Sequence, residues 1–593
     1  MILGIIDFNN DLKSNTKIVD SMLNTVCTSC EFLSSEAFLA SNNCVRKMVA
    51  GEEYTIIFDG EIYNVPELAQ ELRGKRHAFF VGSESELVLN LYIEYGEKCL
   101  QKINGVFAFA IYKAREKSLF LARDRIGAKP LYYKRLSKGI VFASSLKTLF
   151  KHPKCSPVID SSGLNQIFLL GPAKPIGKTC YKDIFEIKNA EYVVLDKSGF
   201  SKKIYWQLKS KTNLQSTTSA VDYLKNLVID ATNRQISTDK KIGSFLSGGL
   251  DSSILSAIAS EKLSNKNKTL FTLNVDYEDN DKNFIANDFQ PESDNEYIKI
   301  MVSSIGSKHS TTVIKTDDIL ANLSKAALAR EFVGMADIDT SLLLASTVAK
   351  KTTSVMLSGE CADELLGGYP WYYKPEFENV NTFPWSRAID MRRGVVKVGV
   401  LKGDANEYID SYYSATIGKA EILDTDTKDD ARVRQLFMLN FEWFMQTLIA
   451  RADRMASAAG ISIRCPFADY RIIEYAYNLP WKTKFMTGRE KGVLRWAFKD
   501  SLPSVVMNRK KSPFPKSFDP KLLAGVKKLA LVALNNKNGI VGELIDKQFV
   551  LDLIDKGELQ TPWYGQLMRL PQLLGFIIQL DVILNEYNVK IEK

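Results

Sequence analysis

The chain has 593 residues, of which 45% are hydrophobic and 25% charged, so its length predicts two or more globular domains and its composition excludes wholesale disorder. Lys and Arg number 78 against 69 Asp and Glu, and the resulting formal charge of +9 is spread over so long a chain that no nucleic-acid partner is required. The three histidines, His77, His152 and His309, lie far apart in the sequence, which argues against a histidine-rich metal site and leaves few candidates for a Ser-His triad.

Residues 1–207 are expected to form one domain rich in β-strands. The segment MILGIIDFNNDLK, which begins it, lacks a basic region followed by a long apolar stretch, so no signal peptide is predicted and cytoplasm is the default location. Short β-type runs, separated by Gly, Lys, Asp and Asn, suit hairpin connections. They are Tyr54–Phe58, Gly105–Tyr112, Ser118–Arg123 and Glu191–Leu195. One helical pattern, SELVLNLYIEYG, lies among them, and a layered α+β or sandwich domain is predicted.

A polar segment at residues 208–219 is expected to link this domain to a second one over residues 220–593. There a helical stretch, Ala220–Gln235, leads into an apolar strand, a glycine turn and another helix, and the apolar runs TLFTLNVDY and SVML follow. Strands that alternate with helical patterns predict a parallel α/β sheet. From about Asp430 onward helical patterns dominate.

One late apolar run, Leu573–Leu584, is long enough to raise the question of a membrane span. It is interrupted by Gln579 and Asp581, and it is shorter than the roughly 20 apolar residues that a spanning helix needs. We therefore expect a buried core helix there and no membrane insertion.

The most informative segment is the loop SGGLDSS, which follows an apolar strand and precedes a helix. Its glycines let the backbone approach an anion closely, and its serine hydroxyls and the free N–H groups of the helix start can donate to phosphates. Asp251 would repel a phosphate on its own, so its expected role is to hold Mg²⁺. A Gly-Gly turn also occurs in strand-to-helix connections that bind nothing, but the full motif in this context favours a phosphate site. The residues of the predicted site are Ser247, Gly248, Gly249, Asp251, Ser252 and Ser253.

A second acidic and glycine-rich segment, SGECADELLGGY, follows the apolar run SVML. It spans Ser358–Tyr369 and places three carboxylates at the carboxyl end of a predicted strand, the edge where open α/β sheets bind their ligands. A lone acidic turn is usually a solvated loop. Here the density of glycines and the apolar approach favour a binding site.

These segments resemble those of a known family. SGGLDSS resembles the pyrophosphate loop of N-type ATP pyrophosphatases rather than the GxxxxGK[ST] loop of kinases, because no Lys follows its second Gly. Nearly the whole chain resembles the asparagine synthetase family, which joins a class II glutaminase domain to a synthetase domain. The resemblance also rests on ESELVLNLYIEYGEKCLQKINGVFAFAIY, LFLARDRIGAKPLYY, RADRMASAAGISIRCPFADYR, GREKGVLRWAF, RKKSPFPKSF and TPWYGQLMRLPQLLGFIIQLDVILNEYNV. It implies an Ntn-like antiparallel β sandwich flanked by helices, followed by a parallel α/β ATP-pyrophosphatase domain with a helical extension.

The resemblance implies an ATP-dependent, AMP-forming carbon–nitrogen ligase that adenylates a carboxylate and releases pyrophosphate. The SGGLDSS residues would bind the ATP phosphates and Mg²⁺. Ser358 and Gly359 would line the nucleotide, with Phe245 and Val275 near the adenine.

Four further positions match family residues that take part in the chemistry. Asp251 and Asp363 match the family's Mg²⁺ carboxylates. Glu360 matches a glutamate that handles the acyl-adenylate and the incoming amine. Lys491 matches a lysine that stabilises the developing phosphate charge, a role that suits a positive donor in an adenylyl-transfer transition state. For Arg464 and the Arg509–Lys511 run, contact with phosphate or substrate and ordinary surface charge both remain open.

The N-terminal domain departs from the family pattern. Glutaminases of this class begin Met-Cys-Gly and use the cysteine thiol as nucleophile, whereas this chain reads MILG and has no cysteine before Cys27. The arginine-bearing HRRL segment is not recognisable in FLASNNCVRKM, the oxyanion Asn is replaced by Asp59, and Glu84 stands in place of an Asp. Because a carboxylate would repel the oxyanion, we expect that glutamine is not hydrolysed. The lone pair Cys27-x-x-Cys30 has no second pair to complete a zinc site, so chance or packing is favoured.

If glutamine supplies no ammonia, another amine must attack the acyl-adenylate. β-Lactam, carbapenam and lasso-peptide macrolactam synthetases are family members with a dead glutaminase domain, and in them the amine belongs to the same substrate as the carboxylate. The resemblance therefore implies intramolecular ligation of a carboxylate substrate that carries an amine, a precursor peptide being one example, and a homodimer made through the glutaminase-like domain.

Two other functions stay open at this point. Gly334–Ser341, where the carboxylate substrate is expected, stays close to the ordinary synthetase branch, which favours an ammonia-dependent asparagine synthetase or another amide-forming synthetase. A regulatory pseudoenzyme is the alternative of a different class. It is disfavoured because SGGLDSS, SGECADE and REKG are all intact.

Overall fold

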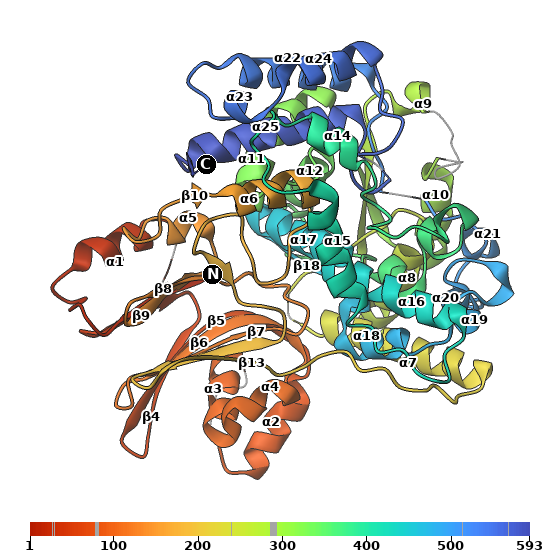
Figure 1. The fold of residues 1–593 in the computed structure, drawn as a ribbon. Helices are drawn as coiled ribbons and strands as arrows, with labels where there is room; N and C mark the ends of the chain where they lie inside the picture. The colour runs from red at the N-terminus through yellow and green to blue at the C-terminus, as the bar shows by residue number, and fades with distance from the viewer. Residues whose placement is uncertain are drawn as a thin grey trace. The chain divides into compact units, whose positions relative to one another are not determined.

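The computed structural model describes residues 1–26, 28, 30–77, 82–238, 240–284, 293–512, 514–566 and 568–592. The Cys27-x-x-Cys30 motif lies partly outside the described residues, so its interpretation stays a prediction. The described chain divides into two compact units (Figure 1). Unit 1 comprises Met1–Gly163, Pro175–Leu208 and Tyr587–Glu592, and unit 2 comprises Leu164–Lys174 and Lys209–Glu586.

Unit 1 contains two six-stranded antiparallel sheets. In spatial order the strands of the first sheet are β11 (Phe185–Glu186), β8 (Tyr132–Leu136), β9 (Gly139–Ala143), β1 (Ile2–Asp7), β3 (Ala37–Ser41) and β2 (Cys30–Leu33). Those of the second sheet are β13 (Gly199–Ile204), β12 (Glu191–Asp196), β7 (Ser118–Arg123), β6 (Gly105–Lys113), β5 (Glu52–Ile62) and β4 (Cys44–Val49). The four β-type runs of the sequence fall in β5, β6, β7 and β12, so those predictions are confirmed.

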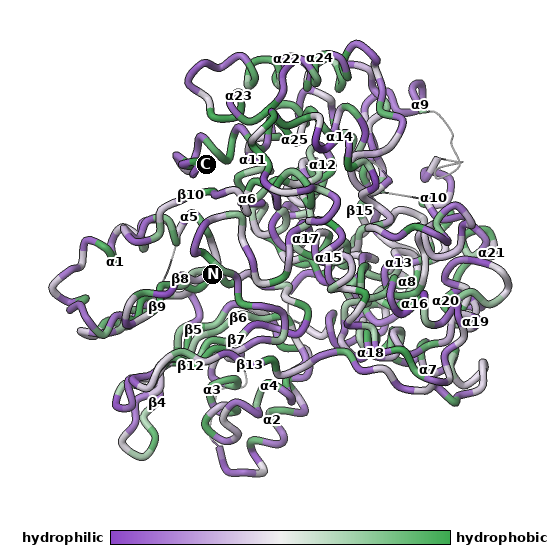
Figure 2. Tube along the Cα trace, viewed as in Figure 1, coloured by the Kyte–Doolittle hydropathy of each residue, from purple (hydrophilic) through white to green (hydrophobic). Residues whose placement is uncertain are grey.

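Alternation along the strands builds the layers of unit 1. Leu39 from the first sheet and Ile57 and Leu121 from the second share one buried core, which makes the sandwich. Ile56, the neighbour of Ile57, faces the other side, where a second core is covered by helices. These helices are α2 (Val65–Gly74), α3 (Glu84–Tyr95) and α4 (Cys99–Lys102). Figure 2 shows hydrophobic residues concentrated along β5, β6 and β7, as this layering requires.

Unit 2 is built on a five-stranded sheet in which every neighbouring pair is parallel. Its strands in spatial order are β16 (Lys308–Ile314), β15 (Phe271–Tyr277), β14 (Ile242–Phe245), β17 (Val355–Leu357) and β18 (Ser462–Arg464). The chain adds strands on one side of β14 and then on the other. The carboxyl ends of β14 and β17 therefore flank a topological switch point, where sheets of this type bind ligands.

Helices cover both faces of this sheet, so the predicted parallel α/β arrangement is confirmed. One face packs against α7 (Thr217–Ile236), α8 (Leu250–Ser264) and α10 (Asn295–Ile305), and the other against α12 (Asp337–Ala349) and α17 (Met445–Ala459). The first of these helices begins before the predicted Ala220, because the Ser216 hydroxyl caps it by accepting from the Ser219 N–H.

The predicted helical region after Asp430 is also observed. It ends in α25 (Leu570–Glu586), which packs against α11 (Thr316–Arg330) and α22 (Pro520–Asn535). The apolar run Leu573–Leu584 lies within α25, and Gln579 is fully buried there, so the predicted core helix is confirmed. Among the described residues, the search for a helix long and apolar enough to cross a membrane finds none.

Candidate active site

The SGGLDSS loop connects the end of β14 to the start of α8 and is shaped by its glycines and serines. Gly248 has a φ of +66°, and a Cβ at this position would lie 2.6 Å from the Cβ of Tyr297, so a side chain would be strained and would clash. The hydroxyls of Ser247 and Ser252 lie 3.0 Å apart, and the Ser247 N–H donates to the Ser252 Oγ at 3.2 Å. The loop is thereby fixed at the N-terminus of α8, a position suited to an anion.

The SGECADE segment meets this loop directly. A Cβ on Gly359 would lie 2.9 Å from both the Asp251 Cβ and the Ser252 amide nitrogen, so only glycine lets the two segments approach this closely. A Cβ on Gly368 would lie 1.9 Å from the Asp363 Oδ1. The glycine density noticed in the sequence therefore has a steric cause. It lets the Asp363 carboxylate and the backbone of the second segment lie against the first turn of α8.

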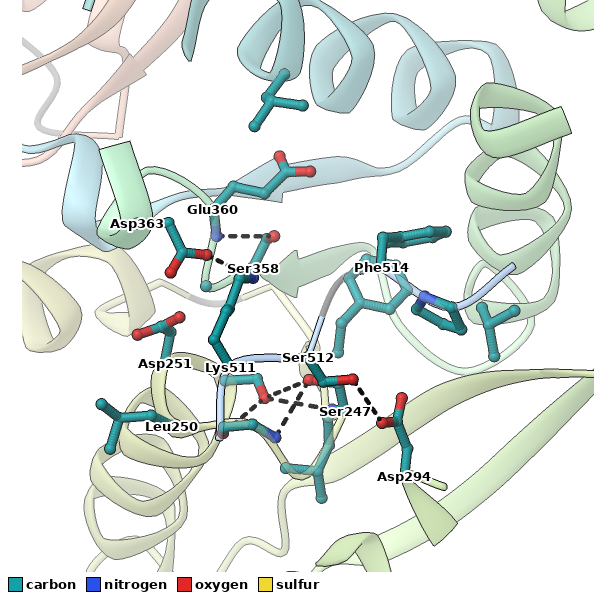
Figure 3. Close-up of a pocket in the computed structure, with 18 of the residues that line it drawn as sticks. Ser247, Leu250, Asp251, Asp294, Ser358, Glu360, Asp363, Lys511, Ser512 and Phe514 are labelled. Atoms are coloured by element: carbon teal, nitrogen blue, oxygen red, sulfur yellow. Dashed lines mark hydrogen bonds and ion pairs between the residues drawn. The ribbon is translucent and has the colours of Figure 1, made fainter. Parts of the chain in front are cut away.

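A buried cluster of opposite charges lies where the two segments meet (Figure 3). The Lys491 ammonium is 2% exposed and lies 2.6 Å from the Asp251 Oδ2 and 2.7 Å from the Asp363 Oδ1. Lys511 adds a second cation, 2.7 Å from the Asp363 Oδ2. Burial alone would lower the pKa of Lys491, but the two carboxylates outweigh burial and raise it. Burial would likewise raise the pKa of Asp363, and the two lysines reverse that shift.

The donor set of this cluster suits Mg²⁺ that arrives with a nucleotide. The Asp251 Oδ1 is buried and has no hydrogen-bond partner in the described part of the chain. Mg²⁺ is commonly held by one or two carboxylates together with substrate phosphates rather than by a full protein cage. Among the described residues, no group of three or more His, Cys, Asp or Glu side chains is placed to hold a metal.

Glu360 lies on the same segment and forms the other half of the cavity. Its Oε1 accepts a hydrogen bond from the Arg451 guanidinium, which lies 5.2 Å from the centroid of the Phe514 ring. Its Oε2 is buried without a hydrogen-bond partner in the residues that the structure describes. Burial would lower the pKa of Arg451, but the Glu360 carboxylate outweighs burial and raises it, so the guanidinium stays charged at neutral pH. The free oxygen is available to a polar group of a ligand.

A cavity of about 220 Å³ at the switch point collects most of the predicted site residues. Those that line it are Phe245, Ser247, Gly249, Asp251, Ser252, Val275, Ser358, Gly359, Glu360, Asp363 and Lys491. Gly248 and Ser253 do not line it: Gly248 shapes the loop, and Ser253 is fully buried beneath it. Phe245 and Val275 come from neighbouring strands and supply an apolar wall, as an adenine ring requires.

Other lining residues were missed or left open by the sequence. Arg509 pairs with Asp294 and donates to the Ser247 carbonyl at 2.9 Å, so it holds the phosphate loop from outside. Lys510 and Lys511 also line the cavity, whereas Arg464 is buried against the Gln235 carbonyl and does not. The run of three basic residues in the sequence indicated that Arg509, Lys510 and Lys511 could lie at the site. Asp294 lies in no recognisable motif.

The chain is similar in sequence to known proteins over both units. A sequence description of the asparagine synthase family matches residues 223–582, and one of the glutamine amidotransferase domain matches residues 42–206. Asparagine synthetase [glutamine-hydrolyzing] 3 of Bacillus subtilis is 38% identical over 92% of this chain and 89% of its own length. The chain belongs to the asparagine synthase family. Asparagine synthetase [glutamine-hydrolyzing] 1 of the same organism is 27% identical over 78% of this chain and 76% of its own length. The asparagine synthetase of Gallus gallus is 25% identical over 86% and 78%.

As a member of the asparagine synthase family, the chain is an ATP-dependent, AMP-forming ligase that makes amide bonds. The ATP predicted from the sequence is the nucleotide that this family uses.

Unit 1 contains most of the region matched by the amidotransferase domain, and its predicted site residues are tied into local contacts. The Met1 amine forms an ion pair with the Asp59 Oδ2 at 3.4 Å. The Glu84 Oε1 accepts from the Ile62 N–H at 2.7 Å. Arg46, which lies in the FLASNNCVRKM segment, donates to a backbone carbonyl at 2.8 Å and lies 4.9 Å from the centroid of the Phe32 ring.

Glu364 gives the asparagine synthase unit a pH dependence. It is 2% exposed, its Oε1 accepts from the Tyr369 hydroxyl at 2.6 Å, and burial raises its pKa to about 7. The folded state binds the Glu364 proton more tightly than the unfolded state does. The free energy of unfolding therefore falls as pH rises from about 4.5 to about 7. At 1.36 kcal/mol per pKa unit, the fall amounts to up to roughly 3 kcal/mol. We expect Glu364→Gln to flatten this part of a curve of unfolding free energy against pH. The matched variant Glu558→Gln, at an exposed position, should keep the wild-type slope. If Glu364→Gln also kept the wild-type slope, the pH dependence could not come from Glu364.

Proposed function

We propose that this member of the family forms an amide by adenylating a side-chain carboxylate of the Asp or Glu type, with Mg²⁺ and without hydrolysing glutamine. The observation that supports the first half is the cluster of Asp251, Lys491 and Asp363 beneath the SGGLDSS loop. A substrate carboxylate oxygen attacks the α-phosphorus of ATP, pyrophosphate leaves, and an amine then displaces AMP from the acyl carbon.

The residues of the cavity divide this work between them. Bound with the nucleotide by Asp251 and Asp363, Mg²⁺ would neutralise phosphate charge and favour the departure of pyrophosphate. Lys491 offers an ammonium at the cavity wall, where it donates to phosphate oxygens as their charge develops. The Glu360 carboxylate points away from the loop (Figure 3), and its free Oε2 accepts a proton of the attacking amine. Arg451 holds the Glu360 side chain in place through its Oε1.

The second half of the proposal, that glutamine is not the nitrogen donor, is supported by the chemistry of unit 1. β1 contains only Ile, Leu, Gly and Asp, so it carries no thiol or hydroxyl nucleophile. The Asp59 carboxylate stands where an amide would stabilise an oxyanion, and it forms an ion pair with the Met1 amine. We infer that the amine comes from the carboxylate substrate itself, as in a cyclisation, with a precursor peptide as one substrate of this kind.

A second candidate is the synthesis of asparagine from aspartate and free ammonia. The 38% identity over most of the chain to the Bacillus subtilis protein named asparagine synthetase [glutamine-hydrolyzing] 3 favours asparagine as the product. The lack of a thiol or hydroxyl in β1 favours free ammonia over glutamine as the nitrogen source. This reaction uses the same cavity and the same adenylate, and differs only in the size of the acid and the source of the amine.

Amide formation with different nitrogen sources tests the proposal. We expect purified enzyme with ATP and Mg²⁺ to release no glutamate from glutamine above the rate without enzyme. Asp59→Asn restores the amide at that position but no nucleophile, so it should stay equally inactive. ATP–pyrophosphate exchange with aspartate, and asparagine formed from ammonium chloride, would favour the second candidate. Glutamate released in step with amide product would refute the proposal.

A further inference from the structure

A second cavity lies beside the nucleotide cavity within unit 2. The two cavities share the lining residues Gly565 and Gln566, and all lining residues of both belong to the same unit. The second cavity has a volume of about 210 Å³, close to the about 220 Å³ of the first. It therefore has room for part of a substrate, and no step of the proposed adenylation uses this cavity.

Apart from the two shared residues, packed aromatic side chains lie between the two cavities. Tyr369 and Phe444 line the nucleotide cavity, and Trp371 and Trp385 line the second one. The Tyr369 and Trp371 rings stack with centroids 4.4 Å apart, and the centroids of Trp385 and Phe444 are 5.2 Å apart. At Gly565 the wall has no side chain, and Gly565 and Gln566 line both cavities, so the two cavities come closest there.

The floor of the second cavity is apolar and aromatic. Trp371, Phe377 and Trp385 are 4–7% exposed, and two buried prolines lie beside them. Such a surface takes up an apolar or aromatic side chain. Two buried donors have no hydrogen-bond partner in the described residues, the Trp371 Nε1 and the Gln566 Nε2. A peptide carbonyl would satisfy a donor of this kind, because buried polar groups are nearly always paired.

Charged side chains form the rim. Arg387 and Arg569 are exposed at the edge of the cavity and face one acidic residue, Glu376. The guanidinium of Arg387 is fixed over the Phe377 ring, 4.6 Å from its centroid. The excess of positive charge favours a carboxylate at the mouth, and arginine pairs well with that group.

We propose that the second cavity binds the residue that follows the activated Asp or Glu in a peptide substrate, with an aromatic side chain on the floor and a carboxylate at the rim. This inference rests on the proposed function, because it assumes that the neighbouring cavity holds the acyl-adenylate. It narrows the substrate class to a peptide-like acid that spans both cavities past Gly565 and Gln566.

The test compares acids of increasing length in ATP–pyrophosphate exchange. The probes are L-aspartate, L-aspartyl-glycine and L-aspartyl-L-phenylalanine. Burying a Phe side chain should raise kcat/KM for the aromatic dipeptide at least about tenfold over aspartyl-glycine. Thr561→Trp, at an exposed lining position, fills the mouth of the cavity and should bring this ratio close to one. Thr352→Trp makes the same change at an exposed position that lines neither cavity, and as the matched control it should keep the wild-type ratio.

Binding measured by calorimetry separates this inference from the proposed function. Tighter binding of aspartyl-phenylalanine than of aspartyl-glycine to the wild-type enzyme supports the second cavity even if no acid gives exchange, a result that would count against the proposed function alone. Equal binding and equal exchange of the two dipeptides by the wild-type enzyme overturns the inference and leaves adenylation standing. A tenfold preference that survives in correctly folded Thr561→Trp also overturns it, because the preference would then arise elsewhere.

Discussion

Lys491→Met is expected to lower ATP–pyrophosphate exchange by about 10²- to 10³-fold, the effect of removing one donor that stabilises charge in a transition state. The Lys491 ammonium lies between two carboxylates and is 2% exposed. Met fills a similar volume but cannot donate to phosphate oxygens or offset their charge. The loss should appear in the first half-reaction, so no acid and no amine should restore the rate.

The same substitution should also destabilise the fold. Removing the cation leaves Asp251 buried without its ion-pair partner, and breaking a buried pair costs about 3–5 kcal/mol. Lys511 still neutralises Asp363, which places the expected loss toward the lower end of that range. Burial raises the pKa of Asp251 and Lys491 opposes that shift, so in the variant acid protonates Asp251 more readily and removes its unpaired buried charge. The stability difference between variant and wild type should therefore shrink in acid.

A matched pair of measurements checks both effects. Lys482→Met makes the same change at an exposed position of α19 (Trp481–Lys484) and should retain wild-type exchange and stability. Urea unfolding of the three proteins gives the stability difference, and exchange is compared only at urea-free conditions where all are folded. Wild-type exchange by Lys491→Met would remove the lysine from the mechanism.

The local parts of this site could be predicted from the sequence because each rests on a short motif with a physical reason. SGGLDSS predicts a strand, a tight turn and a helix N-terminus, and the structure has β14, the loop and α8 in that order. The second acidic segment follows β17 in the same way. The sheet order places these two strand ends side by side, so motifs separated by more than a hundred residues line one cavity.

The remaining site residues depend on contacts that no motif encodes. Arg451 reaches Glu360 from the middle of α17, and Asp294 meets Arg509 from the residue before α10. Arg451 begins the segment RADRMASAAGISIRCPFADYR, but nothing in that segment indicates a partner on the SGECADE segment, and the neighbourhood of Asp294 matches no motif. The second cavity is a stronger case, because its walls come from residues 370–387 and 560–569, and only their packing in unit 2 brings Trp371 next to Gln566.

Glu360→Gln is expected to separate the two half-reactions. Gln keeps the shape of the side chain and an oxygen that can accept from Arg451, so the carboxylate substrate should still be adenylated, and exchange should stay within a few-fold of the wild type. A neutral amide cannot take a proton from the attacking amine, and general base catalysis is typically worth 10²- to 10⁴-fold. Amide product should therefore fall by that factor, and single-turnover experiments should show the acyl-adenylate accumulating.

Two comparisons decide whether this result reports on proton transfer. Glu558→Gln makes the same change at an exposed site and should leave both half-reactions unchanged. Glu360→Asp keeps the base but shortens its reach, so it should lose product formation less severely and retain a pH dependence that Glu360→Gln lacks. Loss of exchange and product formation by the same factor in Glu360→Gln would mean that the carboxylate only holds Arg451 in position. In that event the base for the amine must be another group of the cavity. Glu364, which accepts from the Tyr369 hydroxyl, is the other carboxylate of the cavity that forms no ion pair with a cation among the described residues.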